Sequence, residues 1–459
     1  MEALDRWMER QYRHSAVALL RSVSAVDIVK NRPGFAQIVK PRKGSIVASP
    51  VLGAYDPEPD YFFHWYRDSA VVVDALRLLF EDPSVDCPAL EHFADFIHFS
   101  LSLQEIDGRT LSGASWRDLV APDYRQFVRT NEDLAAVQGE AVAGETRVNP
   151  DGTLDLSQWP RPQYDGPSMR AIAVLRWRHS ARLDAGLNRS VDALLSGDLA
   201  YTRRHWREAC FDIWEEEKGL HYYTLRVAAA ALEGGAGWFE QHGDSAEARA
   251  CRRDATEILD ILDGYWREDA RFYRSRVLES NAPSTKELDI SVIFAALHAA
   301  GGGETHSVHD PHMHATLAKL EALFDAEYPI NRNRASRGPA MGRYAGDVYY
   351  SGGAYYFSTL AAAEFCYRAA LGPAALEPAG REPSAHEPRG LDSPALTALV
   401  ERGDAFLETV RSFTPPSGEL SEQFDQRTGV QRSAQQLAWS YAAFISCAEA
   451  RRQVIQRSA

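Results

Sequence analysis

Five short segments of this 459-residue chain combine aromatic rings with carboxylate and arginine side chains. They are YFFHWYRD (61–68), WPRPQYDGP (159–167), FDIWEEEKG (211–219), GRYAGDVYYSGG (342–353) and LSEQFD (420–425). Aromatic rings cover the apolar faces of a sugar, while Asp and Arg side chains hydrogen-bond its hydroxyl groups in directional pairs. Two carboxylates can also hydrolyse a glycosidic bond through an oxocarbenium-like transition state. The five segments therefore favour a carbohydrate site with hydrolytic chemistry.

The residue pattern argues against other classes of site. The segments contain neither metal-ligand spacing nor a glycine-rich phosphate loop, so we expect no metal and no cofactor. The net charge is −14 and no Lys/Arg-rich tract occurs, which argues against a nucleic-acid partner. The cysteines are widely spaced without a CxxC pair, so we expect reduced thiols. They are Cys87, Cys210, Cys251, Cys366 and Cys447.

The N-terminal sequence MEALDRWMERQYRHSAVALL carries charges throughout and contains no uninterrupted apolar run. It therefore does not resemble a secretory signal peptide. No stretch of the chain approaches the roughly 20 apolar residues of a membrane span. We expect a cytoplasmic protein that acts away from membranes, unless a leader precedes this sequence.

Twelve segments have the apolar periodicity of α-helices. They are Leu4–Val29, Asp68–Phe80, Pro88–Ile106, Gly166–Ala185, Ser190–Ala209, Leu220–His242, Asp244–Arg267, Leu288–Ala300, His312–Tyr328, Tyr355–Leu371, Ser393–Phe413 and Leu437–Val454. The seventh is amphipathic, whereas the eighth, tenth and twelfth are nearly apolar and rich in small residues, as helices surrounded by protein are. We therefore predict an all-α fold of six helical hairpins in a double ring, an (α/α)6 barrel. A helical solenoid is the weaker alternative, because no repeat of fixed period is present.

The composition, 45% hydrophobic and 25% charged, is that of a globular protein with a sizeable core. We predict one catalytic domain over residues 1–459, with 371–394 as a long surface loop. Each of the five aromatic and charged segments falls on a connection from an outer helix to an inner one. In a double ring those connections share one end of the barrel, so we expect a concave site at its mouth.

The segments also carry a family resemblance over nearly the whole chain. YFFHWYRD, WPRPQYDGP, DIWEEEKG, SEQFD and LAWSYAA, in that order, resemble the motifs of the glucoamylases, glycoside hydrolase family 15. The resemblance implies an inverting, exo-acting hydrolase that releases glucose from the non-reducing ends of α-linked gluco-oligosaccharides. Nothing in the sequence resembles a starch-binding module or the N-terminal β-sandwich of many prokaryotic relatives.

The resemblance also implies a role for each matching residue. Glu215 matches the general acid, Glu422 the general base, and Tyr61 a residue that helps to hold the attacking water. The residues that match the glucose-binding positions are Arg67, Asp68 and Arg343. Those that match the pocket lining are Trp65, Trp159 and Trp214. Those that match supports of the acid loop and the next sugar are Arg161, Glu216 and Asp347. An inverting pair of carboxyl groups lies roughly 6.5–9.5 Å apart.

We expect Glu215 to have a raised pKa, caused by crowding from Trp214, Glu216 and Asp212. Two departures from the family pattern leave the linkage preference open. Tyr355 replaces a tryptophan near the second sugar position, and Glu217 replaces a hydrophobic residue beside the acid. Isomaltose and dextran, or trehalose, are therefore alternative substrates, and we expect short substrates to be used at least as well as long ones.

Two other classes of function remain as alternatives. One is a sugar epimerase or isomerase of the same fold. That chemistry usually requires paired histidines, and the segments that lead into the inner helices contain only His64 and His221. The other is an inactive sugar-binding homologue, against which the intact pair Glu215 and Glu422 argues.

Overall fold

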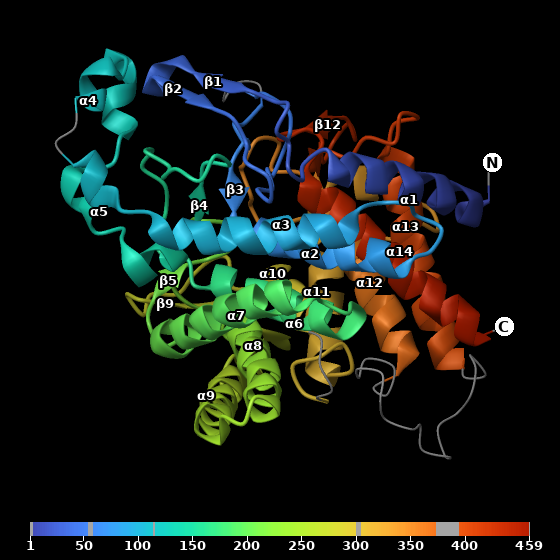
Figure 1. The fold of residues 1–459 in the computed structure, drawn as a ribbon. Helices are drawn as coiled ribbons and strands as arrows, with labels where there is room; N and C mark the ends of the chain where they lie inside the picture. The colour runs from blue at the N-terminus through green and yellow to red at the C-terminus, as the bar shows by residue number, and fades with distance from the viewer. Residues whose placement is uncertain (1–2, 54–57, 113–114, 300–303, 373–393, 459) are drawn as a thin grey trace. The chain divides into compact units, whose positions relative to one another are not determined.

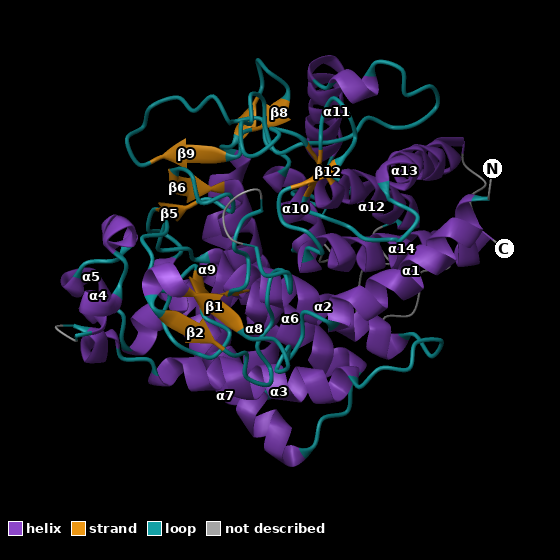
Figure 2. Ribbon diagram, turned by 90° about the horizontal axis from the view of Figure 1, so that it is seen from above, coloured by secondary structure: helices purple, strands orange, loops and turns teal. Residues whose placement is uncertain are grey.

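The computed structural model describes residues 3–53, 58–112, 115–299, 304–372 and 394–458 (Figure 1). Helices dominate these residues and the strands are short (Figure 2). The helices are α1 (Leu4–Leu20), α2 (Tyr66–Glu81), α3 (Ala89–Ser102), α4 (Trp116–Leu119), α5 (Asn131–Ala135), α6 (Asp165–Ser180), α7 (Ala185–His205), α8 (Tyr222–Gln241), α9 (Ser245–Asp263), α10 (Ser291–His298), α11 (Pro311–Glu327), α12 (Tyr356–Leu371), α13 (Pro394–Phe413) and α14 (Ala438–Ser458). The strands are β1 (Lys30–Arg32), β2 (Gln37–Val39), β3 (His64–Trp65), β4 (Arg147–Val148), β5 (Cys210–Phe211), β6 (Lys218–His221), β7 (Trp266–Arg267), β8 (Phe272–Tyr273), β9 (Arg276–Leu278), β10 (Ala354–Tyr355), β11 (Gln423–Phe424) and β12 (Gln431–Arg432).

Each of the twelve predicted helices is present among the described residues, with shifted ends. The first was predicted to reach Val29, but it ends at Leu20, because the chain turns through Ser24 at φ +50° and pairs Val23 with Ile46. The fifth begins at Ala185, five residues early, because the Asp184 carboxylate caps its first turn. The loop predicted at 371–394 lies, from 373 to 393, outside the described residues.

Burial follows the predicted division between amphipathic and apolar helices. Helix α9 alternates buried and exposed positions as its charged face requires. Helix α12 is buried along nearly its whole length, and α10 is buried from Ser291 to Leu297. The fully apolar helices are therefore those enclosed by protein, as their composition predicted.

Residues 107–112 and 115–158 were not predicted as an organised segment. They form the short helices α4 and α5, several single 3-10 turns and strand β4. A buried cluster that includes Leu134, Val142 and Leu154 packs this segment against Tyr66 and Phe99. Its short elements have no apolar periodicity long enough to detect in the sequence.

The described chain forms two compact units. The first unit comprises Met1–Ala18, Leu220–Ala230 and Arg252–Ala459, and the second comprises Leu19–Gly219 and Ala231–Cys251. In the first unit α12 packs against α13 and α14, and β10, β11 and β12 form a small antiparallel sheet. In the second unit α2 packs against α3 and α6, and α6 packs against α7. The prediction of one domain over residues 1–459 stays a prediction.

Candidate active site

The acid candidate Glu215 stands on a tight loop of the second unit. Strands β5 and β6 pair as a hairpin, Phe211 opposite Lys218, and the loop between them turns around Asp212. The Asp212 carboxylate accepts backbone N–H groups from Trp214 at 2.7 Å, Glu216 at 3.3 Å and Glu217 at 2.9 Å. Glu215 has a φ of +66°, a left-handed conformation that costs energy for a residue with a Cβ. The loop therefore holds its carboxyl group in a strained but fixed position.

Two tryptophan indoles bind the Glu215 carboxyl group, one at each oxygen. Trp65 Nε1 donates to Oε1 at 2.8 Å, and Trp159 Nε1 donates to Oε2 at 2.6 Å. The two indoles meet edge to face with ring centroids 6.4 Å apart. The Glu215 side chain is 11% exposed, so one buried carboxyl group is held by two N–H donors and retains a path to the surface.

Burial raises the pKa of Glu215 above its ordinary value. The guanidinium groups of Arg67 and Arg147 and the two indole donors act in the opposite direction without cancelling the effect of burial. The direction agrees with the sequence prediction. Burial is the main cause, and the carboxylates of Glu216 and Asp212 are not among the largest effects. The Asp212 carboxylate accepts hydrogen bonds from backbone amides of the loop, and these bonds hold the loop in its conformation.

Arg67 joins this loop to the start of helices α2 and α6. Its guanidinium donates to Gln163 Oε1 at 3.2 Å and to Asp165 Oδ2 at 3.1 Å, and lies 3.5 Å from Glu215 Oε1. Gln163 in turn donates to the Asp212 carbonyl oxygen at 2.6 Å. Asp68, 3.4 Å from Arg67, has a pKa raised by burial. The motifs YFFHWYRD and WPRPQYDGP thus hold the acid loop together.

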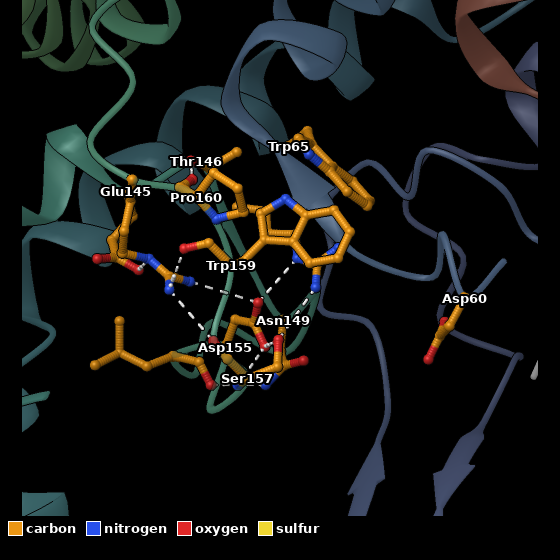
Figure 3. A network of polar contacts seen from close by, with 12 residues as sticks. Asp60, Trp65, Glu145, Thr146, Asn149, Asp155, Ser157, Trp159 and Pro160 are labelled. Atoms are coloured by element: carbon orange, nitrogen blue, oxygen red, sulfur yellow. Dashed lines mark hydrogen bonds and ion pairs between the residues drawn. The ribbon is translucent and has the colours of Figure 1, made fainter. Parts of the chain in front are cut away.

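The polar network beneath the indoles is shown in Figure 3, where dashed lines join Asp155 to its neighbours close to Trp159. Arg161 donates to the Trp159 carbonyl oxygen at 2.9 Å, and its guanidinium lies 3.1 Å from Glu145 and 3.5 Å from Asp155. Arg161 therefore supports the backbone that carries Trp159.

The remaining candidates of the second unit are Tyr61, Trp214 and Glu216. The ring of Tyr61 packs 5.2 Å from that of Trp65, and both Tyr61 and Trp214 are half-buried. Glu216 is exposed, next to the acid along the chain. Among the second-unit candidates, the structure thus brings Trp65, Trp159 and Arg67 directly to the Glu215 carboxyl group.

The base candidate Glu422 lies in the first unit, one residue before strand β11. Its backbone N–H donates to the Ala434 carbonyl oxygen at 2.7 Å, and Ser433 Oγ donates to Glu422 Oε2. The residue is 8% exposed. The paired strands β11 and β12 therefore place a hydroxyl donor on a nearly buried carboxylate.

Arg343, Asp347 and Tyr355 form a second cluster in the same unit. Arg343 and Asp347 make a bidentate ion pair, with N–O distances of 2.7 and 2.6 Å. Tyr355 donates its hydroxyl to Asp347 Oδ2 at 3.0 Å and accepts from Gln423 Nε2 at 2.8 Å. Tyr355, which replaces a tryptophan of the family pattern, is 0% exposed, so its ring presents no face for a second sugar. Its role here is to fix Asp347, because its ring and hydroxyl are both committed to protein.

Both histidines named for the epimerase alternative are buried. His64 is fully buried, its Nδ1 accepts the Ile46 N–H at 3.0 Å, and burial lowers its pKa to about 3. His221 is 2% exposed. Within the described ranges no group of three or more His, Cys, Asp or Glu side chains is arranged to hold a metal ion, and no helix is long and apolar enough to cross a membrane.

Several residues of the site were missed or undervalued by the sequence interpretation. Gln163 and Asp165 lie inside the quoted WPRPQYDGP motif and could have been found there. Arg147 and Ser433 lie in segments without a recognisable pattern, so the sequence offered no indication of them. The separation between Glu215 and Glu422 stays a prediction.

The chain is similar to known glucoamylases. The family described as Glycosyl hydrolases family 15 matches residues 143–449. The chain is 28% identical to a probable glucoamylase of Schizosaccharomyces pombe, covering 99% of this chain and 93% of the relative. It is 26% identical to an intracellular sporulation-specific glucoamylase of Saccharomyces cerevisiae, covering 99% and 85%.

The structure is similar to that of the Hormoconis resinae glucoamylase, with a TM-score of 0.76 and 26% identity over 98% of this chain and 74% of the other. This likeness confirms the all-α (α/α)6 barrel as the fold class predicted from the sequence.

Proposed function

The chain belongs to the glycosyl hydrolases of family 15, and on that premise we propose an exo-acting, inverting reaction in which Glu215 is the acid and Glu422 the base. The enzyme is a glucoamylase-like glycoside hydrolase. Its proposed substrates are α-linked gluco-oligosaccharides, from whose non-reducing ends it releases glucose one unit at a time.

The observation that carries the proposal is the environment of Glu215. A general acid must hold its proton at mild pH and release it to the leaving oxygen during bond cleavage. Burial favours the protonated carboxyl group, while the indole donors of Trp65 and Trp159 stabilise the carboxylate that forms after proton transfer. Glu215 is therefore suited both to carry the proton and to give it up.

In the proposed reaction Glu215 transfers its proton to the glycosidic oxygen as the bond from that oxygen to the anomeric carbon breaks. A water molecule attacks the anomeric carbon from the opposite face and loses a proton to Glu422. Glucose leaves with inverted configuration, Glu215 is left ionised and Glu422 protonated, and exchange with solvent restores both. The Ser433 hydroxyl orients the Glu422 carboxylate for this step.

The substrate-binding part of the proposal rests on the polar residues beside the two carboxyl groups. Arg67 and Asp68 carry charge at the start of α2, next to Glu215. Asp347 fixes the guanidinium of Arg343 in two hydrogen bonds, which suits directional recognition of sugar hydroxyl groups. We assign these residues to the terminal glucose, because charged side chains of this kind hydrogen-bond sugar hydroxyl groups directionally.

We propose that short substrates are used at least as well as long ones. Tyr355 replaces the family's tryptophan near the second sugar position and offers no exposed ring there. Each additional glucose unit then gains little stacking energy. The same preference suits the cytoplasmic location that we propose, where soluble oligosaccharides are the available substrates. A steep rise of kcat/KM from disaccharide to soluble starch would contradict this.

The catalytic assignment is tested by Glu215→Gln and Glu422→Gln, which keep the shape of each side chain and remove its proton-transfer role. Each variant should lose roughly 10²–10⁴-fold in kcat on maltose while keeping the thermal unfolding temperature of the parent within a few degrees. Retention of more than about a tenth of the parent rate by either variant would refute the assignment.

Stereochemistry and linkage are tested on the unmodified enzyme. Proton NMR of the first minutes of hydrolysis should show β-glucose, and initial α-glucose would exclude inversion. A panel of maltose, isomaltose, trehalose, maltodextrin and dextran compares the 1,4-linked substrates with the 1,6-linked and trehalose alternatives, and the highest kcat/KM identifies the preferred linkage.

A further inference from the structure

The backbone places Arg147 directly opposite one of the indoles that hold Glu215. Strands β3 and β4 pair antiparallel with Trp65 opposite Arg147 and His64 opposite Val148. Side chains directly opposite each other on one face of such a pair are in contact. The position of Arg147 beside Trp65 thus follows from the pairing of β3 with β4, two strands of the second unit.

The guanidinium of Arg147 lies against three aromatic rings. Its central carbon is 3.7 Å from the ring centroid of Trp159, 4.0 Å from that of Phe63 and 4.7 Å from that of Trp65. A planar guanidinium stacks on aromatic faces in a way that a compact ammonium group cannot. Arg147 therefore contacts both indoles that donate to Glu215.

A buried carboxylate anchors this guanidinium. Arg147 Nε donates to Asp155 Oδ2 at 2.8 Å, and Arg147 Nη2 donates to Ser157 Oγ at 3.2 Å. Asp155 also accepts the backbone N–H and the hydroxyl of Ser157 at 2.9 and 2.7 Å, and Figure 3 shows both residues beside the Trp159 indole. Although burial favours its protonated form, the charges of Arg147 and Arg161 hold the pKa of Asp155 below its ordinary value. The anchor is therefore ionised and rigid.

We propose that Arg147 is a positioning residue for the general acid: it fixes the indoles of Trp65 and Trp159, and through them the orientation of the Glu215 carboxyl group. The proposal rests on the proposed role of Glu215 as the acid. Arg147 is assigned no contact with substrate. Its contribution is the geometry of the two N–H donors, to which proton transfer is sensitive because small misplacements of a catalytic group are costly.

Arg147 also acts on Glu215 through its charge. The largest charge effects on the Glu215 carboxyl come from Arg67, on helix α2, and Arg147, on strand β4, and both lower the pKa that burial raises. Arg67 is itself paired with Asp68 and Asp165. Removing the charge of Arg147 therefore raises the pKa of Glu215, and the alkaline limb of the kcat/KM profile, where the acid loses its proton, moves to higher pH.

The experiment separates ring stacking from charge with two variants and two substrates. Arg147→Met removes the charge, and Arg147→Lys keeps it without the planar group. Maltose needs a protonated leaving oxygen, whereas α-glucosyl fluoride has a leaving group that depends far less on an acid. Arg147→Met should lose at least about 10-fold in kcat on maltose and less than about 3-fold on the fluoride. Its alkaline limb should move upward.

Arg147→Lys should lose activity selectively on maltose while its alkaline limb stays near that of the parent. The matched control is Arg170→Lys, because Arg170 forms an equally buried bidentate pair with Asp198 between α6 and α7. This control should lower the unfolding temperature and leave both the substrate ratio and the pH profile unchanged.

Equal losses on both substrates with an unmoved alkaline limb would show that Arg147 only stabilises the fold, and would overturn the proposal, as would full maltose activity in either variant. If Arg147→Met fails to fold, the substrate ratio of Arg147→Lys decides. Glu215→Gln is measured in parallel. If that variant keeps its maltose activity, the proposed function itself fails. If it is inactive while the Arg147 variants behave like the control, only the positioning role fails.

Discussion

Replacing Trp159 with phenylalanine would remove one of the two N–H groups that bind the Glu215 carboxyl group and keep an aromatic ring in place. The bond that disappears is the 2.6 Å contact from Trp159 Nε1 to Oε2, while the Trp65 donor at 2.8 Å remains. The Arg147 guanidinium, 3.7 Å from the ring centroid, can still stack on the new ring. The change therefore isolates one hydrogen bond to the acid.

The size of the expected fall in kcat depends on how strong this hydrogen bond is in the transition state. A hydrogen bond to a charged group contributes roughly 1.5–3 kcal/mol, and Glu215 becomes charged only as it gives up its proton. With the proton about half transferred, the transition state loses about half of this, or roughly 0.7–1.5 kcal/mol. That free energy corresponds to a fall of roughly 3–13-fold in kcat on maltose. Because the lost donor favoured the carboxylate, the pKa of Glu215 rises further and the alkaline limb moves upward.

The assay is the pH dependence of kcat and kcat/KM on maltose, with α-glucosyl fluoride as the substrate that depends less on the acid. Trp159→Phe should affect maltose more than the fluoride. An alkaline limb that moved to lower pH would refute the reasoning, because it would mean that the indole stabilises the protonated acid. An unchanged kcat on maltose would show that the hydrogen bond does not strengthen during proton transfer.

Three further substitutions test the surrounding structure. Asp212→Ala should destabilise the fold by at least about 2 kcal/mol in chemical denaturation and lower kcat, because three backbone N–H groups lose a charged acceptor. Gly352→Ala should lower the unfolding temperature by several degrees, because the glycine has a φ of +61° and an added Cβ would lie 2.1 Å from the Asp347 carbonyl oxygen; an unchanged melting curve would contradict this. Burial lowers the pKa of His64 in the folded protein to about 3, from an ordinary value of 6.5. Between these two pH values only the unfolded chain binds the proton. The free energy of unfolding therefore falls as the pH drops through this window, by at most about 1.4 kcal/mol per pH unit. His64→Gln, which keeps an acceptor for the Ile46 N–H, should flatten this slope in urea unfolding between pH 4 and 7, and an unchanged slope would contradict the burial argument.

Long elements with a strong periodic pattern could be predicted from the sequence. Helix α12 was predicted at Tyr355–Leu371 and spans Tyr356–Leu371, because an apolar run of that length has few other ways to satisfy its backbone groups when buried. The start of α7 was missed because the capping residue Asp184 precedes the apolar pattern. The strand pair of β3 with β4 was missed because two residues carry no alternation to detect.

The candidate site divides in the same way. Residues inside motifs, such as Trp65, Trp159 and Glu215, could be assigned because type and spacing together were distinctive. The residues that hold these side chains in place could not be assigned from the sequence. Arg147, for example, is recognised only from the pairing of β3 with β4 and from its buried ion pair with Asp155, both of which form in the folded chain. The cause of the raised Glu215 pKa was missed for a related reason: burial is a property of the packed chain, and neighbours along the sequence do not report it.

The left-handed backbone of Glu215 implies a conflict between folding and catalysis at this one residue. A glycine or asparagine would adopt a φ of +66° at less cost than glutamate, which gives up about 1 kcal/mol to hold this geometry. A substitution that relieves this strain and stabilises the fold therefore removes the acid. A catalytically dead protein with asparagine or glycine here would be relieved of the strain and of the buried carboxyl group, which makes it a favourable scaffold for trapping an uncleaved oligosaccharide in a crystal.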